Sequence, residues 1–220
     1  MTKMKKMPKI ALGAWAWGND GTFGGNLISE ALKPVFDTAM KEGLNLWDTA
    51  YAYGMGTSEK VLGEFLATVP RDSYLISDKF TPQCADPSAE NAVTALYEKS
   101  AELLGTDYMD FSGKYDTEHP FPEDSDRGRT YNPMLSKLEK LNKGLEEIAD
   151  RHHVATAQIP VAWAIAKGTL PIIGVTKVYQ VEDAVKAVAV ELSTEEIETI
   201  EKLGNEAQVN VIRYWEKEMK

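Results

Sequence analysis

This sequence has little cysteine, histidine or basic charge, and it has no long apolar run. These absences exclude several classes of protein. A single cysteine, Cys84, excludes an internal disulfide and a thiolate metal cluster, and it favours a reducing cytoplasm. The 24 lysines and arginines are outnumbered by 34 aspartates and glutamates, and the net charge of −10 argues against a nucleic-acid partner. No stretch is apolar enough to span a membrane, and the early apolar residues are interrupted by Gly13 and Gly18, unlike a signal peptide.

What the sequence does contain is typical of one globular domain. It has 220 residues, of which 43% are hydrophobic and 26% charged. A chain of this length can bury a sizeable core. We therefore expect a single domain over residues 1–220, with an irregular loop at 112–132 where prolines, glycines and charges replace any periodicity.

Helix and strand patterns alternate along the first half of the chain. Apolar spacing and cap residues, including Asp86 as an N-cap before Pro87, predict helices over 32–40, 57–66 and 86–105, and strands over 44–48, 74–79 and 108–111. Three successive pairs of this kind favour a parallel sheet with helical crossovers.

The alternation resumes after the loop. Helices are predicted over 132–150, 156–168, 180–187 and 193–204, and strands over 170–175 and 188–192. Ser193 and Glu196 have the spacing of a capping box at the start of the last helix. The whole pattern is that of an α/β protein.

Three polar residues stand at or just beyond predicted strand ends. Asp48 and Lys79 end two strands, and Tyr53 follows the first by a short turn. A nearby lysine favours the phenolate and so lowers the pKa of a tyrosine, which can then act as a general acid, while an aspartate can hold the lysine by a charge-assisted hydrogen bond. Taken singly, each residue has an ordinary alternative: a packing tyrosine, or a salt bridge.

The residues around this trio resemble the signature of the aldo/keto reductases. The matching segments are Asp48-Thr49-Ala50, Tyr53-Gly54, Ser58-Glu59 and Leu62-Gly63. Further segments are similar to other motifs of the family, in the family's order: Leu12-Gly13-Ala14-Trp15, Ser77-Asp78-Lys79-Phe80 and Pro171-Ile172-Ile173-Gly174-Val175-Thr176-Lys177.

The resemblance implies a TIM-type (β/α)₈ barrel that reduces carbonyls with NAD(P)H. Asp48, Tyr53 and Lys79 match three members of the family's catalytic tetrad, while the fourth, a histidine, has no match, and His119 is not transferred to its place. The segment after Phe111 resembles a later part of the barrel, so the resemblance predicts an incomplete barrel lacking strands four to six, with a seam near Phe111 and Ser112.

The resemblance also implies a nicotinamide cofactor, with NADP(H) expected over NAD(H). Its expected contacts are Gly13, Ala14 and Trp15 after the first strand, and Gly174, Val175, Thr176, Lys177, Gln180, Glu182 and Asp183 near the last. Backbone N–H groups and the Lys177 ammonium could hold a phosphate there, although an ordinary turn with a solvated lysine is the alternative. Trp15 is the best candidate for a substrate pocket, and Trp17 and Trp47 are weaker ones.

Two functions remain open. One is an oxidoreductase that reduces aldehydes or ketones, and the other is a non-catalytic, truncated cofactor-binding remnant of the family. Partners would be a small carbonyl substrate and, through open sheet edges, a second copy of the chain. No metal is expected, since His152 and His153 are adjacent and do not share a helix face.

Overall fold

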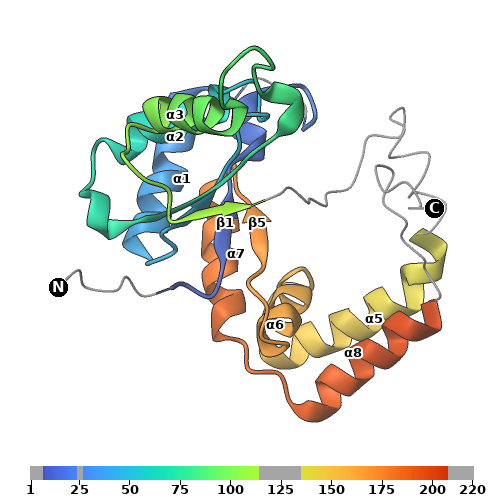
Figure 1. Ribbon diagram of the computed structural model, residues 1–220. Helices are drawn as coiled ribbons and strands as arrows, with labels where there is room; N and C mark the ends of the chain where they lie inside the picture. Colours follow the sequence, from blue (N-terminus) through green and yellow to red (C-terminus); the bar gives the residue numbers. More distant parts are fainter. Residues whose placement is uncertain (1–6, 24–26, 114–134, 208–220) are drawn as a thin grey trace, which may run out of the picture. The chain divides into compact units, whose positions relative to one another are not determined.

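The computed structural model describes residues 7–23, 27–113 and 135–207 (Figure 1). The chain divides into two compact units, Met1–Tyr115 with Gly168–Val188, and Asp116–Lys167 with Ala189–Lys220. The single domain expected from the sequence over residues 1–220 stays a prediction. Within the described ranges no helix combines the length and apolar character that a membrane span needs.

A parallel sheet forms the centre of the first unit. Its strands are β1 (Ala11–Gly13), β2 (Leu46–Asp48), β3 (Leu75–Lys79), β4 (Phe111–Gly113) and β5 (Ile172–Gly174), in the spatial order β4-β3-β2-β1-β5. All four pairings are parallel, and their register brings Gly13 beside both Asp48 and Gly174. Because parallel strands end at a common edge, the residues after β1, β2, β3 and β5 are gathered together.

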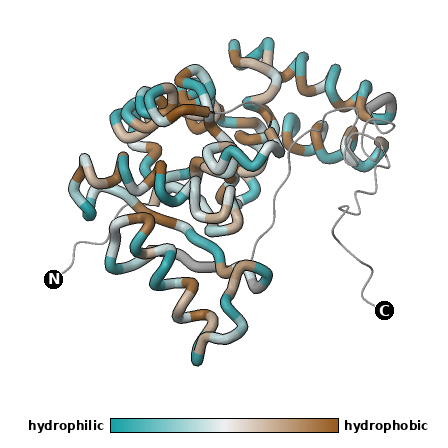
Figure 2. Tube along the Cα trace, turned by 90° about the horizontal axis from the view of Figure 1, so that it is seen from above, coloured by the Kyte–Doolittle hydropathy of each residue, from teal (hydrophilic) through white to brown (hydrophobic). Residues whose placement is uncertain are grey.

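Helical crossovers connect these strands. The crossovers are α1 (Ser29–Lys41), α2 (Thr57–Leu66) and α3 (Ala92–Leu104), and a further helix, α7 (Val178–Ala189), follows β5. Hydrophobic and hydrophilic residues alternate along the helical parts of the trace (Figure 2), and in α1 the residues Leu32, Val35, Phe36 and Ala39 form the buried face. The buried aromatic residues Phe36, Trp47 and Phe65 pack together with Trp17, which assigns Trp17 and Trp47 to the core.

The α3 helix starts later than the sequence pattern predicts. Asn91, not Asp86, is its N-cap, and the Asn91 side chain accepts hydrogen bonds from the N–H groups of Val93 and Thr94. Asp86 instead accepts hydrogen bonds from the N–H and hydroxyl of Ser88, which closes a local turn. An aspartate can serve a turn as well as a helix cap, so the motif alone did not distinguish the two.

Two strand predictions were wrong: one strand lies at a different position, and the other is not formed. The strand expected at 108–111 occurs at Phe111–Gly113, because Arg71 holds the preceding residues by hydrogen bonds to Tyr108 O and the Asp110 carboxylate. The strand expected at 188–192 is absent, since α7 continues to Ala189 and the apolar residues beyond it pack on helices of the second unit. Nearly all of the loop expected at 112–132 lies outside the described residues.

Helices build the second unit: α5 (Leu135–His152), α6 (Gln158–Ala166) and α8 (Thr194–Ala207). Their common core contains Leu145, Ile148, Ala149, Ile159 and Ile200. The predicted capping box is present, since the N–H of Ser193 donates to Glu196 Oε2 at 3.0 Å and the N–H of Glu196 donates to Ser193 Oγ at 3.2 Å. Glu196 also contacts Arg151 and His152, which joins α8 to α5.

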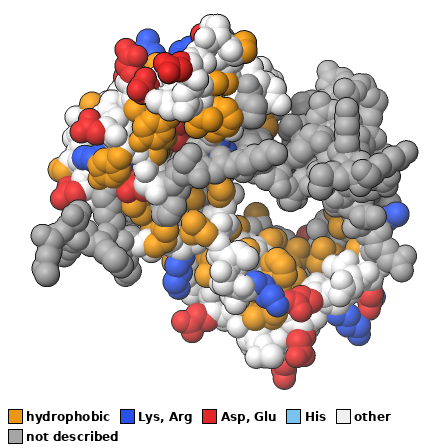
Figure 3. Space-filling model, viewed as in Figure 1, with side chains coloured by type: hydrophobic (Ala, Val, Ile, Leu, Met, Phe, Trp, Pro, Cys, Tyr) orange, Lys and Arg blue, Asp and Glu red, His pale blue; other side chains and the backbone are white. Residues whose placement is uncertain are grey.

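The edge strand β5 differs from β1 in its exposure. Every residue of β1 is buried, whereas Ile172 in β5 is 50% exposed and the flanking Leu170 is 41% exposed. Hydrophobic side chains reach the surface of both units on the face shown in Figure 3. A strand that pairs on one side leaves backbone groups on the other side available to a partner.

Replacement of the capping glutamate, Glu196→Gln, should destabilise the helical unit by about 1 kcal/mol near neutral pH. Burial opposes ionisation, but the hydrogen bonds from the Ser193 N–H, His152 and Arg151 prevail, so the pKa of Glu196 is lowered to about 2. A lowered pKa stabilises the fold above the unfolded value near 4.5 and loses that effect as pH falls toward 2. Urea unfolding at pH 7 and pH 3 measures the difference. Glu195→Gln, an exposed neighbour, is the control, and equal losses in both variants would contradict the prediction.

Candidate active site

Three side chains meet at the carboxyl edge of the sheet. Lys79 Nζ, at the end of β3, lies 2.6 Å from Asp48 Oδ2, at the end of β2, and 3.2 Å from the Tyr53 hydroxyl. Lys79 Nζ also donates to the carbonyl oxygen of Thr49 at 2.9 Å. All three side chains are more than nine-tenths buried. The structure therefore brings together the acid, the ammonium and the phenol that the sequence singled out.

Burial and charge act in opposite directions on Lys79. Desolvation is the larger effect and lowers the pKa of Lys79, while the carboxylate of Asp48, its hydrogen bond and the charge of Asp78 raise it again. Asp48 is in turn oriented by Ser77, whose hydroxyl donates to Asp48 Oδ1 at 3.0 Å. The ammonium is thus held close to the phenol by groups with few alternative positions.

Tyr53 is fixed both by its ring and by its backbone. Its ring stacks on Trp15, with centroids 5.3 Å apart and planes 12° apart. A Cβ atom added to Gly18 would lie 2.5 Å from the carbonyl carbon of Tyr53, and one added to Gly54 would lie even closer to Gly18 O. Only glycine fits at either point, so the turn after β1 and the turn after β2 are pressed together.

Hydrogen bonds of Ser58 form a second link between these turns. The hydroxyl of Ser58 donates to Ala14 O at 2.7 Å and lies 3.0 Å from the hydroxyl of Thr49. Both hydroxyls are fully buried. The serine of the family-like motif therefore joins α2 to the ends of β1 and β2.

Sequence reasoning missed one feature of the site, a pair of buried acids behind Lys79. Glu59 is fully buried and Asp78 is 4% exposed. Burial is the main cause that raises the pKa of Glu59 to about 8 and that of Asp78 to about 6, and the charge of Asp78 raises the Glu59 value further. A glutamate in the third position of a helix looks like ordinary dipole chemistry in the sequence, so the pattern gives no sign that this one is buried.

The predicted cofactor residues lie after β1 and around the start of α7. Gly13 and Gly174 are register partners, so neither strand end presents a side chain there. The Gln180 side chain accepts hydrogen bonds from the N–H groups of Thr176 and Lys177, at 2.7 and 3.0 Å. The Lys177 side chain is exposed. These N–H groups are therefore satisfied within the chain, a role for Gln180 that the sequence did not indicate.

The remaining predicted cofactor contacts are Val175, Glu182 and Asp183. The N–H of Val175 donates to Gly13 O at 3.3 Å, and Val175 O accepts the indole N–H of Trp17 at 2.7 Å. Glu182 is exposed, and Asp183 forms an ion pair with Lys186.

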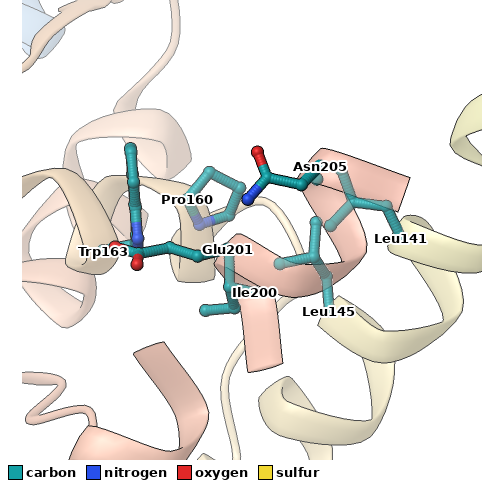
Figure 4. A pocket seen from close by; sticks show the side chains of 8 residues that line it. Leu141, Leu145, Pro160, Trp163, Ile200, Glu201 and Asn205 are labelled. Carbon is teal, nitrogen blue, oxygen red and sulfur yellow. The ribbon is translucent and has the colours of Figure 1, made fainter. Parts of the chain in front are cut away.

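The second unit has a pocket of its own, of about 540 Å³. Figure 4 shows side chains from α5, α6 and α8 around it, and the lining comprises Leu141, Leu145, Pro160, Trp163, Ile200, Glu201, Gly204 and Asn205. Its one ionisable residue, Glu201, forms an ion pair with Lys167. Asp48, Tyr53 and Lys79 are not among the lining residues, and the lining has no acid paired with a base.

Parallel strands joined by helices, with a buried acid, lysine and tyrosine at their carboxyl edge, define an α/β protein equipped for proton transfer. The model of the aldo/keto reductase family matches residues 9–112 and 111–205. The chain therefore belongs to the aldo/keto reductase family. The two matches meet at the seam that the sequence predicted near Phe111 and Ser112.

Curated relatives resemble only part of the chain. An aldo-keto reductase of Gibberella moniliformis is 32% identical over 138 residues, which are 60% of this chain and 40% of that protein. A putative aryl-alcohol dehydrogenase of Schizosaccharomyces pombe is 36% identical over 74 residues, 34% of this chain and 19% of that protein. The NADH-specific methylglyoxal reductase of Escherichia coli is 32% identical over 85 residues, 34% of this chain and 26% of that protein. The matches thus span less than half of these relatives.

Solved structures confirm the fold class. The aldo-keto reductase of Klebsiella pneumoniae in complex with NADPH has a TM-score of 0.68 at 18% identity, covering 90% of this chain and 91% of that one. The glycerol dehydrogenase of Gluconobacter oxydans has a TM-score of 0.74 at 16% identity, covering 94% of each chain. With a five-stranded sheet where a full barrel has eight strands, the fold is a TIM-type barrel in incomplete form.

Loss of the lysine, in Lys79→Met, should reduce the free energy of unfolding by roughly 3–5 kcal/mol, because the Asp48 carboxylate would remain buried without its counter-ion. Chemical unfolding followed by fluorescence measures the change. The double variant Asp48→Asn with Lys79→Met should recover much of the loss. Lys60→Met, at an exposed position of α2, is the control and should stay within about 0.5 kcal/mol of the parent. A Lys79→Met protein as stable as the control would show that the pair is not desolvated.

Proposed function

We propose that this chain reduces aldehyde or ketone carbonyls to alcohols with a nicotinamide cofactor, NADP(H) in preference to NAD(H). The observation that carries the proposal is the position of Lys79 Nζ between Asp48 and the Tyr53 hydroxyl. Reduction of a carbonyl needs a proton for the developing alkoxide, and a phenol beside a buried ammonium is suited to donate it.

Each member of the trio has a distinct role in this proposal. The Tyr53 hydroxyl donates its proton to the carbonyl oxygen. The Lys79 ammonium, 3.2 Å from that hydroxyl, stabilises the phenolate that remains. Asp48 keeps Lys79 charged and oriented through the 2.6 Å hydrogen bond. The stacked Trp15 ring holds Tyr53 and offers an apolar wall for the substrate.

The cofactor would supply the hydride, and the residues present are compatible with holding it. The bare strand ends at Gly13 and Gly174 permit a close approach to the backbone, and the exposed Lys177 can meet a phosphate. Gln180 would have to rotate to release the N–H groups of Thr176 and Lys177. The NADPH bound by the Klebsiella pneumoniae protein supports NADP(H), whereas the Escherichia coli relative is named as NADH-specific.

The second candidate function is a cofactor-binding remnant without turnover. One reason for it is that the matches cover less than half of the length of the curated relatives. The other is that the sequence has no match for the histidine of the family's catalytic tetrad. His119, which was not assigned to that role, lies outside the described residues. The two candidates differ in one observable, the consumption of NADPH in the presence of a carbonyl substrate.

The test compares the parent protein with Tyr53→Phe, which keeps the ring on Trp15 but removes the proton. Expected are substrate-dependent NADPH oxidation by the parent and a loss of roughly 100-fold or more in the variant. NADPH binding, followed by quenching of tryptophan fluorescence, should be equal in both. Tyr97→Phe, on α3 and partly exposed, is the control and should keep full activity. Turnover that survives in Tyr53→Phe contradicts the mechanism, and binding without turnover in the parent supports the remnant.

We also propose that two copies of the chain associate through an open sheet edge, since β4 and β5 stand at the two ends of the strand order. Light scattering at micromolar concentration should give twice the mass of the 220-residue chain. Ile172→Lys, on the half-exposed edge strand, should shift the mass toward the monomer, whereas Tyr97→Lys on α3 should not. A parent protein that is a uniform monomer contradicts this proposal. The cytoplasmic location stays a prediction from the single cysteine.

A further inference from the structure

The loop after β1 carries a carboxylate that the proposed mechanism does not use. Asp20 Oδ2 accepts the indole N–H of Trp15 at 2.9 Å, and Asp20 Oδ1 accepts the backbone N–H of Thr22 at 2.9 Å. Desolvation opposes ionisation of this carboxyl, but the hydrogen bonds from Thr22 and Trp15 outweigh it, so the pKa of Asp20 is lowered. The Asp20 side chain is therefore ionised near neutral pH and engaged at both oxygens.

A second pair of hydrogen bonds anchors the backbone directly before Asp20. The Asn19 side chain accepts the N–H of Leu27 at 2.7 Å and donates to Leu27 O at 2.8 Å. Asn19 has a positive φ of 50°, a conformation that asparagine adopts more readily than most residues. Asp20 thus follows a fixed point of the chain, so it can restrain Trp15 rather than follow the motion of that ring.

The ring that Asp20 holds contacts two other aromatic rings. Trp15 stacks on Tyr53 with planes 12° apart, and it meets Phe23 edge-on, with centroids 5.1 Å and planes 83° apart. Tyr53 is 2% exposed, Phe23 is 37% exposed, and Trp15 is partly buried. The three rings form an aromatic wall that extends from the buried proton donor of the proposed reaction to the surface.

Stacking by itself leaves an indole ring some freedom, because offset-stacked and edge-on arrangements are both favourable for aromatic pairs. A hydrogen bond from the indole N–H adds a preferred direction, and an ionised acceptor makes that bond stronger than a neutral acceptor would. The bond to Asp20 therefore favours one orientation of Trp15, in which the indole lies parallel to the ring of Tyr53.

We infer that Asp20 is a positioning residue that acts through Trp15, and that Asp20, Trp15 and Phe23 together set a preference for carbonyl substrates with a flat, apolar group. A planar ring can lie against the exposed part of the aromatic wall, whereas a puckered ring makes poorer contact with it. The preference among substrates rests on the proposed function, since Tyr53 is the proton donor of that reaction. The restraint of Trp15 by Asp20 does not rest on it.

Ultraviolet resonance Raman spectroscopy tests the restraint, because one indole band shifts with the strength of the hydrogen bond at the indole N–H. Subtracting the spectrum of the matching Trp15→Phe protein isolates the signal of Trp15. Asp20→Ala should shift this band toward weaker hydrogen bonding, whereas Asp37→Ala, at an exposed position of α1, should leave it unchanged. A band that stays in place in Asp20→Ala overturns the inference.

Binding of two alcohols in the presence of NADPH tests the preference. Benzyl alcohol has a flat ring and cyclohexylmethanol a puckered one of similar size, and neither can be reduced, so no turnover is needed. The parent should bind benzyl alcohol more tightly. Asp20→Ala should weaken that binding roughly fivefold, as expected for the loss of one hydrogen bond, and change cyclohexylmethanol little. Saturation-transfer NMR measures both dissociation constants. A parent without the preference, or an Asp20→Ala protein that keeps it, overturns the inference.

A cycle of variants separates an action through Trp15 from a direct contact of Asp20 with the ligand. In Trp15→Phe, which keeps a ring but removes the N–H, the further change Asp20→Ala should leave the binding of benzyl alcohol unchanged. Additive losses in the double variant overturn the inference.

Kinetics distinguish this inference from the proposed function. If the parent turns over, Asp20→Ala should raise KM for benzaldehyde and keep kcat within about twofold, unlike Tyr53→Phe. A loss in kcat with an unchanged KM overturns the positioning role. An inactive protein with the Raman shift and the binding preference would retain this inference for ligand binding and lose only the proposed reduction. An active protein without them would retain only the proposed function.

Discussion

The ion pair between Lys79 and Asp48 is the interaction on which the rest of the site depends. Two charges can be buried only if every donor and acceptor around them is matched, and here Ser77, Thr49 and Tyr53 supply the remaining partners. Ser77 lies within β3, and Thr49 and Tyr53 follow β2, so the pair also links β2 to β3. Burial of the Lys79–Asp48 ion pair therefore requires that the surrounding segments be held in fixed positions.

Close backbone contacts hold these segments in place. Gly18 and Gly54 let the turns after β1 and β2 touch, Ser58 ties both turns to α2, and Gly63 admits the backbone of Leu103 and Leu104 against α2. None of these residues belongs to the trio of Asp48, Tyr53 and Lys79. They remove the freedom of the segments that carry Tyr53 and Asp48, which explains why the motif extends well beyond the trio. The exclusion of water follows from the same contacts, and it strengthens every interaction within the site.

The sequence predicted the order of the elements and the residues of the trio, since both rest on local signals: apolar periodicity, caps and strand ends. It failed where one residue type serves two purposes. Asp86 closes a turn instead of capping α3, and the apolar residues near 190 pack on helices instead of pairing in a sheet. Contacts between distant segments, such as the hydrogen bond from Ser58 to Ala14 O, leave no periodic pattern in the sequence, so only the folded chain shows them.

The strand order explains how an incomplete barrel can keep both groups of predicted site residues. Asp48, Tyr53 and Lys79 come from β2, β3 and the turn between β2 and α2, all within the first family match, while the expected cofactor contacts come chiefly from β5 and α7 in the second. β1 pairs with both β2 and β5, so within the described sheet it joins the two groups. Segments that would lie on the far side of a complete barrel position neither group. The geometry of Lys79, Asp48 and Tyr53 is set by β2, β3 and the turn after β2, which all lie within the described part of the chain.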